Sequence, residues 1–337
     1  MTMIPETHEA FVRMRPELLA GRPGLVDLSE TNAYSSLAFL SPRPLLREGR
    51  VHRCHLAQAW LRLWGLPEGH SGRALICEGV RSALALIGGR LAESGESILI
   101  PSDVYPAYAR ILSEAGTSFS IAEMGRGLRS APLGPHRFLL LCEPSKPRGF
   151  PAGREELELV LSWLSEDRER RVVIDAVYAD PSRPTEALST FLRHPQAIVL
   201  HSLSKGWLSP RILGVALVPE SDADRFSSSF RGASPSASSL AMGEALLNDF
   251  PDRPSLVRAF AEEANLRADD LLASLGFRMP GHGARDRGGI VYLRTLDVPW
   301  TVLLERGALA LPAIVFGGSP ASSVISSLPS AFRAAAV

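Results

Sequence analysis

The chain contains two lysines against thirty-four arginines, and one of the two, Lys205, lies in the segment His201-Ser-Leu-Ser-Lys-Gly-Trp. An arginine stays protonated at any workable pH and cannot condense with a carbonyl group. A buried lysine can lose its proton and form a Schiff base. A lone lysine is most simply a surface cation, so the residues around Lys205 decide between the two interpretations.

Two other side chains that could take part in catalysis lie at the end of a predicted strand and just after it. The run Val172-Val-Ile-Asp175-Ala-Val-Tyr178 places a carboxylate at the end of a strand and a phenol three residues later. The carboxyl end of a strand in an open α/β sheet faces the crevice where ligands bind. An acid for a pyridinium nitrogen, a phenol for a ring oxygen and an amine for an imine together suit pyridoxal phosphate. Alone, Asp175 could be a capping residue, but the three in this order predict that cofactor.

Composition excludes several other classes of function. The formal net charge is zero, which predicts neither a nucleic-acid partner nor a membrane surface. The three cysteines, Cys54, Cys77 and Cys142, fit no disulfide framework and no metal-ligand spacing, so we expect no metal and a reducing cytoplasm. We find no signal-peptide pattern and no apolar run of about 18 residues, the length that a membrane span needs.

The elements around these residues alternate between strand and helix. A long chain with 45% hydrophobic residues can form a large core, and this alternation predicts an α/β fold with a mostly parallel sheet between helices. The predicted strands are 74–77, 97–100, 118–122, 138–142, 172–177, 197–200 and 215–218. The predicted helices between them are 82–91, 107–115, 154–165 and 185–192.

The two ends of the chain have a different character. Residues 1–45 are rich in proline and polar residues, which predicts an extended arm with a short helix. After residue 225 we expect a helical stretch, a long helix over 255–274, and two strands at 290–293 and 310–315. We therefore divide the chain into an arm at 1–45, a large cofactor-binding domain at 46–250 and a small C-terminal α/β domain at 251–337 that packs with the arm.

At this point the chain resembles the class I/II aminotransferases, and among them the histidinol-phosphate aminotransferase-like members. Ile76-Cys-Glu-Gly79-Val80-Arg81 resembles the family's glycine turn, where amides at a helix N-terminus hold the cofactor phosphate. Pro101-Ser-Asp-Val-Tyr105-Pro resembles the family's Pro-x-Tyr-Pro segment, in which an aromatic ring stacks on the pyridine. The resemblance also implies a homodimer with sites at the subunit interface.

The resemblance assigns a role to each of the matching residues. Asp175 would pair with the pyridinium nitrogen, and Tyr178 would donate to the phenolic oxygen of the ring. Lys205 would form the Schiff base and then move the α proton of the substrate. The remaining matches would form the phosphate cup: Ser202, Ser204 and Arg211.

Two departures from the family concern the cofactor site. The family's Asn-Pro-x-Asn-Pro-Thr-Gly loop reads Glu143-Pro-Ser-Lys146-Pro-Arg-Gly149, so Lys146 replaces an asparagine that donates to the phenolic oxygen. An ammonium there could donate more strongly, turn outward or contact the substrate. The phosphate arginine is also displaced, because Arg211 follows Lys205 by six residues where the family has eight, and an arginine in this chain can equally be a surface residue.

A third departure concerns the substrate. The family's carboxylate-binding arginine is replaced by Ile325 in Ser323-Val-Ile-Ser-Ser. Either another cation such as Arg294 or Arg333 takes over, or the substrate is not a free α-amino acid. The segment Leu25-Val-Asp-Leu-Ser-Glu-Thr-Asn32-Ala-Tyr34 resembles the family's entry arm, so Asn32 and Tyr34 are candidate substrate residues. His52, Arg53 and His55 occupy the region from which the family's partner-subunit tyrosine reaches the phosphate.

These matches favour a pyridoxal-phosphate-dependent aminotransferase that transfers an amino group between a small amine or amino acid and a keto acid. The departures would suit specialised metabolism. The same residues could support other carbanion chemistry, in a decarboxylase, lyase, cyclase or oxidase. A non-catalytic binding or regulatory relative is the third hypothesis, and an absorption band from bound cofactor would exclude it.

Overall fold

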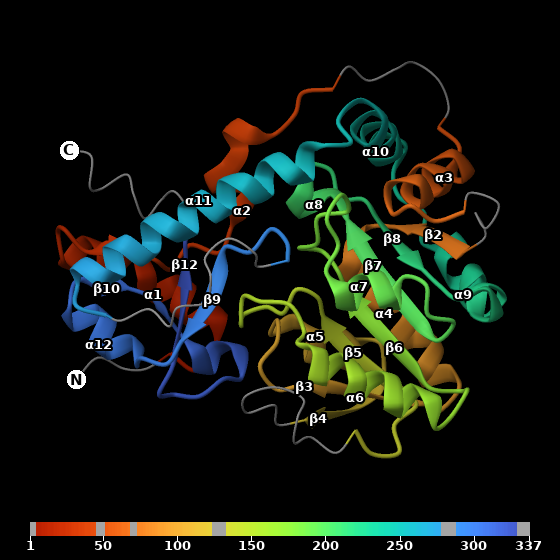
Figure 1. The fold of residues 1–337 in the computed structure, drawn as a ribbon, viewed down its shortest axis with the longest axis horizontal. Helices are drawn as coiled ribbons and strands as arrows, with labels where there is room; N and C mark the ends of the chain where they lie inside the picture. The colour runs from red at the N-terminus through yellow and green to blue at the C-terminus, as the bar shows by residue number, and fades with distance from the viewer. Residues whose placement is uncertain (1–4, 45–50, 68–72, 123–132, 278–287, 329–337) are drawn as a thin grey trace.

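A seven-stranded sheet forms the centre of the protein in a computed structural model that describes residues 5–44, 51–67, 73–122, 133–277 and 288–328 (Figure 1). The strand order is β2-β8-β7-β6-β5-β3-β4; β8 runs antiparallel to both of its neighbours and the other pairs are parallel. The predicted mostly parallel α/β sheet is therefore confirmed. The strands are β2 Ala74–Cys77, β3 Ser97–Pro101, β4 Ser118–Ala122, β5 Phe138–Cys142, β6 Arg171–Asp175, β7 Ala197–Ser202 and β8 Gly214–Leu217.

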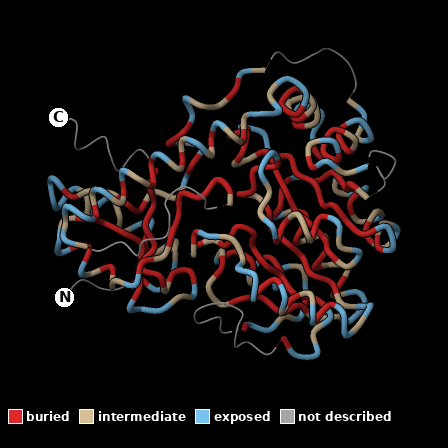
Figure 2. Tube along the Cα trace, viewed as in Figure 1, coloured by how far each residue is buried: buried red, intermediate tan, exposed pale blue. Residues whose placement is uncertain are grey.

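Both faces of this sheet are buried because successive strand side chains point to opposite sides. Along β5, for example, Leu139 and Leu141 belong to one core, whereas Phe138 and Leu140 belong to the other. Figure 2 shows the buried strands inside a more exposed shell. One face is covered by α3 Arg53–Leu63, α6 Arg154–Ser165, α7 Glu186–Phe191 and α10 Ala237–Asp249, and the other by α4 Gly79–Glu93, α5 Ala107–Glu114 and α9 Glu220–Gly232.

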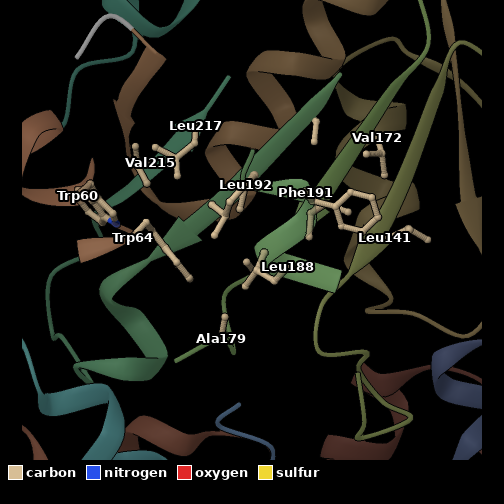
Figure 3. Close-up of a cluster of buried hydrophobic side chains, with 14 of the residues drawn as sticks. Trp60, Trp64, Leu141, Val172, Ala179, Leu188, Phe191, Leu192, Val215 and Leu217 are labelled. Carbon is tan, nitrogen blue, oxygen red and sulfur yellow. The ribbon is translucent and has the colours of Figure 1, made fainter. Parts of the chain in front are cut away.

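Large side chains fill the first of these cores. In Figure 3, Leu188 and Phe191 of α7 lie beside Leu141 and Val172 of the sheet, while Trp60 approaches the sheet from α3. The side chains in this core are drawn from strands and helices that are far apart in the sequence. This packing holds the carboxyl ends of β5, β6 and β7 in fixed positions, and those ends carry the candidate site.

The described residues from Arg253 onward form a second assembly. The helix α11 Arg253–Ser274 leads to an antiparallel sheet in the order β11-β12-β9 (Figure 1). The N-terminal segment docks here, because β1 pairs in parallel with β10, Val26 opposite Ala308. We keep the domain boundaries near residues 45 and 250 as a proposal. The elements are α1 His8–Gly21, β1 Val26–Asp27, α2 Ala33–Leu37, β9 Leu293–Leu296, α12 Trp300–Glu305, β10 Ala308–Leu309, β11 Leu311–Pro312 and β12 Ser323–Ser326.

Some predicted elements were wrong in their extent. The helix of the arm, α1, is 14 residues long and not short. The strand predicted to reach residue 177 ends at Asp175, and the strand predicted at 290–293 begins only at Leu293. The strand predicted at 310–315 is divided, because β11 stops at Pro312 and a 3-10 helix follows at Ala313–Phe316. Proline has no backbone N–H to donate to a strand ladder, which favours this break.

Among the described helices, none has the length and apolar character needed to span a membrane.

Candidate active site

One cavity of about 910 Å³ lies at the carboxyl ends of the central strands. It is formed by segments that are far apart in the sequence, including the residues before α1, the turn before α4, the start of α5 and the ends of β6 and β7. Most of the predicted site residues line it: Gly79, Val80, Arg81, Tyr105, Lys146, Asp175, Tyr178, Ser202, Ser204 and Lys205. The structure therefore brings together the acid, the phenol and both lysines of the chain.

The turn before α4 has a backbone shape that favours glycine. Gly79 has a φ of +78°, in the left-handed region that L side chains rarely adopt, and a Cβ built there would lie 2.9 Å from Cγ2 of Ile212. Gly79 also begins α4, so amides of the first helical turn have no acceptor within the helix. The hydroxyl oxygens of Ser202 and Ser204, which also line the cavity, lie 2.7 Å apart. The amides at the start of α4 and these two hydroxyls can together bind an anion. The dipole of α4, positive at its N-terminus, favours that charge.

The carboxylate of Asp175 is buried at the end of β6 and has two donors. The amide of Val177 donates to Oδ1 at 3.0 Å, and the hydroxyl of Tyr108 donates to Oδ2. Burial raises the pKa of Asp175, and the hydrogen bond from Tyr108 acts in the opposite direction. Burial also holds the pKa of Tyr108 well above its ordinary value, so this phenol stays protonated and remains a donor. The sequence interpretation missed Tyr108, although it lies only three residues after Tyr105.

Lys146 is held between aromatic rings. Its ammonium donates to the hydroxyl of Tyr178 at 2.5 Å, and its Nζ lies 4.8 Å from the Tyr178 ring centroid and 5.1 Å from that of Tyr105. Burial and the nearby charge of Lys205 lower the pKa of Lys146, which Tyr292 partly offsets. Among the three alternatives for this residue, the structure therefore excludes an outward-turned side chain.

Tyr292 is a second site residue that the sequence interpretation missed. Its hydroxyl lies 2.9 Å from that of Tyr178 and donates to the carbonyl oxygen of Thr31 at 3.4 Å. Burial raises the pKa of Tyr292, but the charges of Lys205 and Lys146 outweigh burial and leave it below its ordinary value. The residue lies in an apolar run 114 positions after Tyr178, and no local pattern indicates such a contact.

Lys205 lies in the short helix α8 Leu203–Gly206, directly after β7. Its Nζ is 5.7 Å from the ring centroid of Tyr178, and both residues line the cavity together with Asp175. Neighbouring parallel strands end at the same edge of a sheet, so β6 and β7 necessarily bring Asp175 and Lys205 to one place. The amine, the phenol and the carboxylate therefore face one space large enough for a small ligand.

Three predicted residues do not line this cavity. Arg211 is exposed, and Tyr34 and Asn32 are exposed as well. The N-terminal segment reaches the cavity through other residues, Glu6, Thr7, His8, Glu9 and Thr31. Arg53 donates to the carbonyl oxygens of Ile76 and Phe230. Its guanidinium therefore holds the backbone together at these two residues.

Neither Ile325 nor Arg294 faces the cavity. Ile325 is fully buried in a core with residues of α11, and Arg294, its partner across the β12–β9 ladder, forms an ion pair with Asp269. The expectation that Arg294 replaces the carboxylate-binding arginine therefore finds no support in this geometry. Arg333 lies outside the described residues.

Two sequence comparisons find proteins that are similar to this chain. The family model for class I and II aminotransferases matches residues 41–325. A probable N-acetyl-LL-diaminopimelate aminotransferase of Bacillus subtilis (strain 168) is 27% identical over 148 residues, which cover 40% of this chain and only 37% of that protein.

Solved structures show the same fold along nearly the whole chain. An aspartate aminotransferase double mutant of Thermus thermophilus has a TM-score of 0.70 at 17% identity, covering 99% of this chain and 96% of that one. An aminotransferase of Mycobacterium tuberculosis has a TM-score of 0.70 at 18% identity, covering 98% and 96%. At such low identity these structures establish the fold alone.

Proposed function

Because the chain belongs to the class I and II aminotransferase family, we propose that it is a pyridoxal-phosphate-dependent aminotransferase that acts through Lys205. The observation that carries this proposal is the meeting of Lys205, Asp175 and Tyr178 in one cavity, beside the Gly79 turn. Its substrates would be a small amine or amino acid and a keto acid. A homodimer, a cytoplasmic location and a role in specialised metabolism belong to the same proposal.

The residues present fit this cofactor. A phosphate needs N–H and O–H donors, and the turn at Gly79 presents backbone amides at the start of α4, in a conformation that glycine adopts without strain. A pyridinium nitrogen needs a buried carboxylate, and Asp175 provides it at the end of β6. A phenolic oxygen needs donors, and Tyr178 with Lys146 can supply them. Each of these groups faces the same cavity.

When bound, pyridoxal phosphate supplies an aldehyde for amines and an electron-withdrawing ring. Lys205 would hold the cofactor covalently and, once displaced by the substrate, would carry the proton of the substrate's α carbon. Asp175 would keep the ring nitrogen protonated, and Tyr108 would keep the Asp175 carboxylate ionised and oriented. Tyr105 would lie against the ring.

Other residues that line the cavity would hold the phosphate, and Tyr292, next to Tyr178, would order the site. We assign the phosphate to the backbone amides of Gly79, Val80 and Arg81 and to the hydroxyls of Ser202 and Ser204. Tyr292 would fix the hydroxyl of Tyr178 through their 2.9 Å contact. Arg211, Asn32 and Tyr34 lie away from the cavity lining, and the proposal does not depend on them.

Transamination differs from the other reactions of the same scaffold because it converts the bound cofactor reversibly to its amine form. A panel of amines and amino acids should convert the bound cofactor to its amine form, with one keto or aldehyde product per site, and a keto acid should restore the original spectrum. Lys205→Arg keeps the positive charge but cannot form the covalent bond, so it should lose this cycle. Release of carbon dioxide or ammonia, with the cofactor unchanged in form, would contradict transamination and favour a decarboxylase or lyase.

A further inference from the structure

We propose that Lys146 is the cation that binds the carboxylate of the substrate, in the role that the family gives to an arginine of the C-terminal segment. This inference rests on the proposed function for the identity of the substrate, but the anion site itself can be tested without it. It identifies the substrate as one that carries a carboxylate near its reactive amine.

The C-terminal segment offers no arginine for this role within the described residues. On β12, Val324 belongs to the core that includes Tyr178 and Tyr292, whereas Ile325 faces the core formed with α11. Neither side chain can bind an anion. Arg294 has its charge satisfied by Asp269, and its side chain is 4% exposed.

The other arginines at the cavity are less suitable. Arg81 lies in the first turn of α4, beside the turn that we assign to the phosphate. Arg110 is 54% exposed, and it lies 3.9 Å from both Glu9 and Glu114. A carboxylate at Arg110 would compete with two acidic groups and with solvent, which makes that position weak for recognition.

Lys146 has the geometry that these arginines lack. Its ammonium carries three N–H donors, and the hydroxyl of Tyr178 accepts one of them. The rings of Tyr105 and Tyr178 hold it in place, and it faces the same cavity as Lys205. A second donor would serve the phenolic oxygen of the cofactor, as proposed above, and the third is left for a carboxylate that arrives next to the reactive amine.

Burial makes the charge of Lys146 unfavourable by itself and strengthens its attraction for a carboxylate. A buried ammonium is attracted to an incoming carboxylate more strongly than an exposed one, because the surrounding medium screens less. Burial also lowers the pKa of Lys146, and a bound carboxylate would act in the opposite direction. At a pH high enough to leave part of Lys146 deprotonated, binding should therefore be accompanied by proton uptake. The titratable groups that act on Lys146 are His8, Cys142, Asp175, Tyr178, Lys205 and Tyr292.

Calorimetry with propionate, succinate and 3-phenylpropionate, each against the alcohol of the same skeleton, tests the proposal. The protein is used both loaded with cofactor and without it, in two buffers of different ionisation enthalpy. The variants are Lys146→Met, which removes the charge, and Lys146→Arg, which fixes the charge at every pH. Arg154→Met, which removes an exposed cation that does not line the cavity, is the control.

At a pH where Lys146 is only partly protonated, we expect at least one carboxylate to bind the wild type with proton uptake, and to bind about tenfold or more weakly to Lys146→Met. Lys146→Arg should bind without proton uptake, and affinity should no longer fall at high pH. Equal affinity in Lys146→Met, or no carboxylate bound by the wild type in either form, would overturn the proposal. If carboxylates bind through Lys146 but no cofactor attaches to Lys205, the proposed function fails and this inference stands.

Discussion

The hydroxyl of Tyr108 donates a hydrogen bond to the buried carboxylate of Asp175, from a helix that begins at the exit of a different strand. Tyr108 is 2% exposed, and burial keeps the phenol protonated. The contact therefore supports the ionised form of an aspartate that burial alone would tend to neutralise. We infer that Asp175, the proposed partner of the cofactor's ring nitrogen, depends on Tyr108 for its charge.

Tyr108→Phe tests this dependence. The ring that packs in the core is kept and only the donor is lost, which should weaken cofactor binding by about 10- to 100-fold, the range for a hydrogen bond to a charged group. Equilibrium dialysis of pyridoxal phosphate against the unloaded protein measures the effect, and thermal unfolding shows whether the fold is intact. Unchanged affinity in a folded variant would show that Asp175 does not need this donor.

Gly79→Ala should disturb the phosphate turn. At φ +78° an alanine is strained by about 1–2 kcal/mol, and its Cβ would press on Ile212. We expect a lower melting temperature and weaker cofactor binding.

Gly89→Ala is the matched control, because Gly89 lies inside the same helix and a Cβ added there would have no neighbouring atom within 4 Å outside that helix's own backbone. The control should stabilise the protein by about 0.5–1 kcal/mol. Equal effects of the two substitutions would contradict a special role for Gly79.

Glu143 should give the protein a measurable pH dependence of stability. Its carboxylate accepts from the amide of Ala152 at 2.9 Å and from the hydroxyl of Thr185 at 2.7 Å, and so anchors the loop that carries Lys146. Burial raises the pKa of Glu143 to about 7, from 4.5. Because the folded state holds the proton more tightly, this group's contribution is fully present below pH 4.5 and is lost as the pH rises through about 7.

Glu143→Gln removes that titration. The difference in unfolding free energy between wild type and variant should shift by an amount on the order of 2–3 kcal/mol between pH 4.5 and 8, to the disadvantage of the wild type at high pH. Chemical denaturation at several pH values measures it. A constant difference across this range would mean that folding does not raise the pKa of Glu143.

Arg294 and Asp269 should matter for stability and not for the substrate. Removing Arg294 alone leaves the partly exposed Asp269 without its partner and should cost about 1–3 kcal/mol, whereas the double change Arg294→Met with Asp269→Leu should recover most of that loss. The double variant should bind carboxylates as the wild type does in calorimetry. Loss of carboxylate binding in a folded double variant would return the substrate role to Arg294.

The sequence predicts the large sheet well because its strands are short apolar runs bounded by breakers. β2, β4 and β5 have the predicted bounds, and so does α6. The side chains of β2 and β5 are buried on both faces, so local hydrophobicity is enough to mark them. The family model and the similar solved structures confirm the expected family and fold.

Local sequence patterns could not predict the bounds of the C-terminal strands or the site contacts of Tyr108 and Tyr292. The apolar run from Ala308 to Phe316 is divided between two ladders and a 3-10 helix, and only tertiary pairing decides where each begins. Tyr108 has the pattern of a core residue in a helix, and Tyr292 that of a core residue near a strand. Their hydrogen bonds span 67 and 114 positions, which no local periodicity encodes.

The most direct test of the account uses the rarity of lysine in this chain. The protein is mixed with pyridoxal phosphate, its visible absorption is recorded, and borohydride then fixes the cofactor for peptide mapping. With only Lys146 and Lys205 present, the labelled side chain can be identified without ambiguity. We predict a visible band that borohydride abolishes, label on Lys205, an unchanged label site in Lys146→Arg, and no band in Lys205→Arg. No band in the wild type, or label on Lys146, would contradict the central claim that Lys205 holds the cofactor.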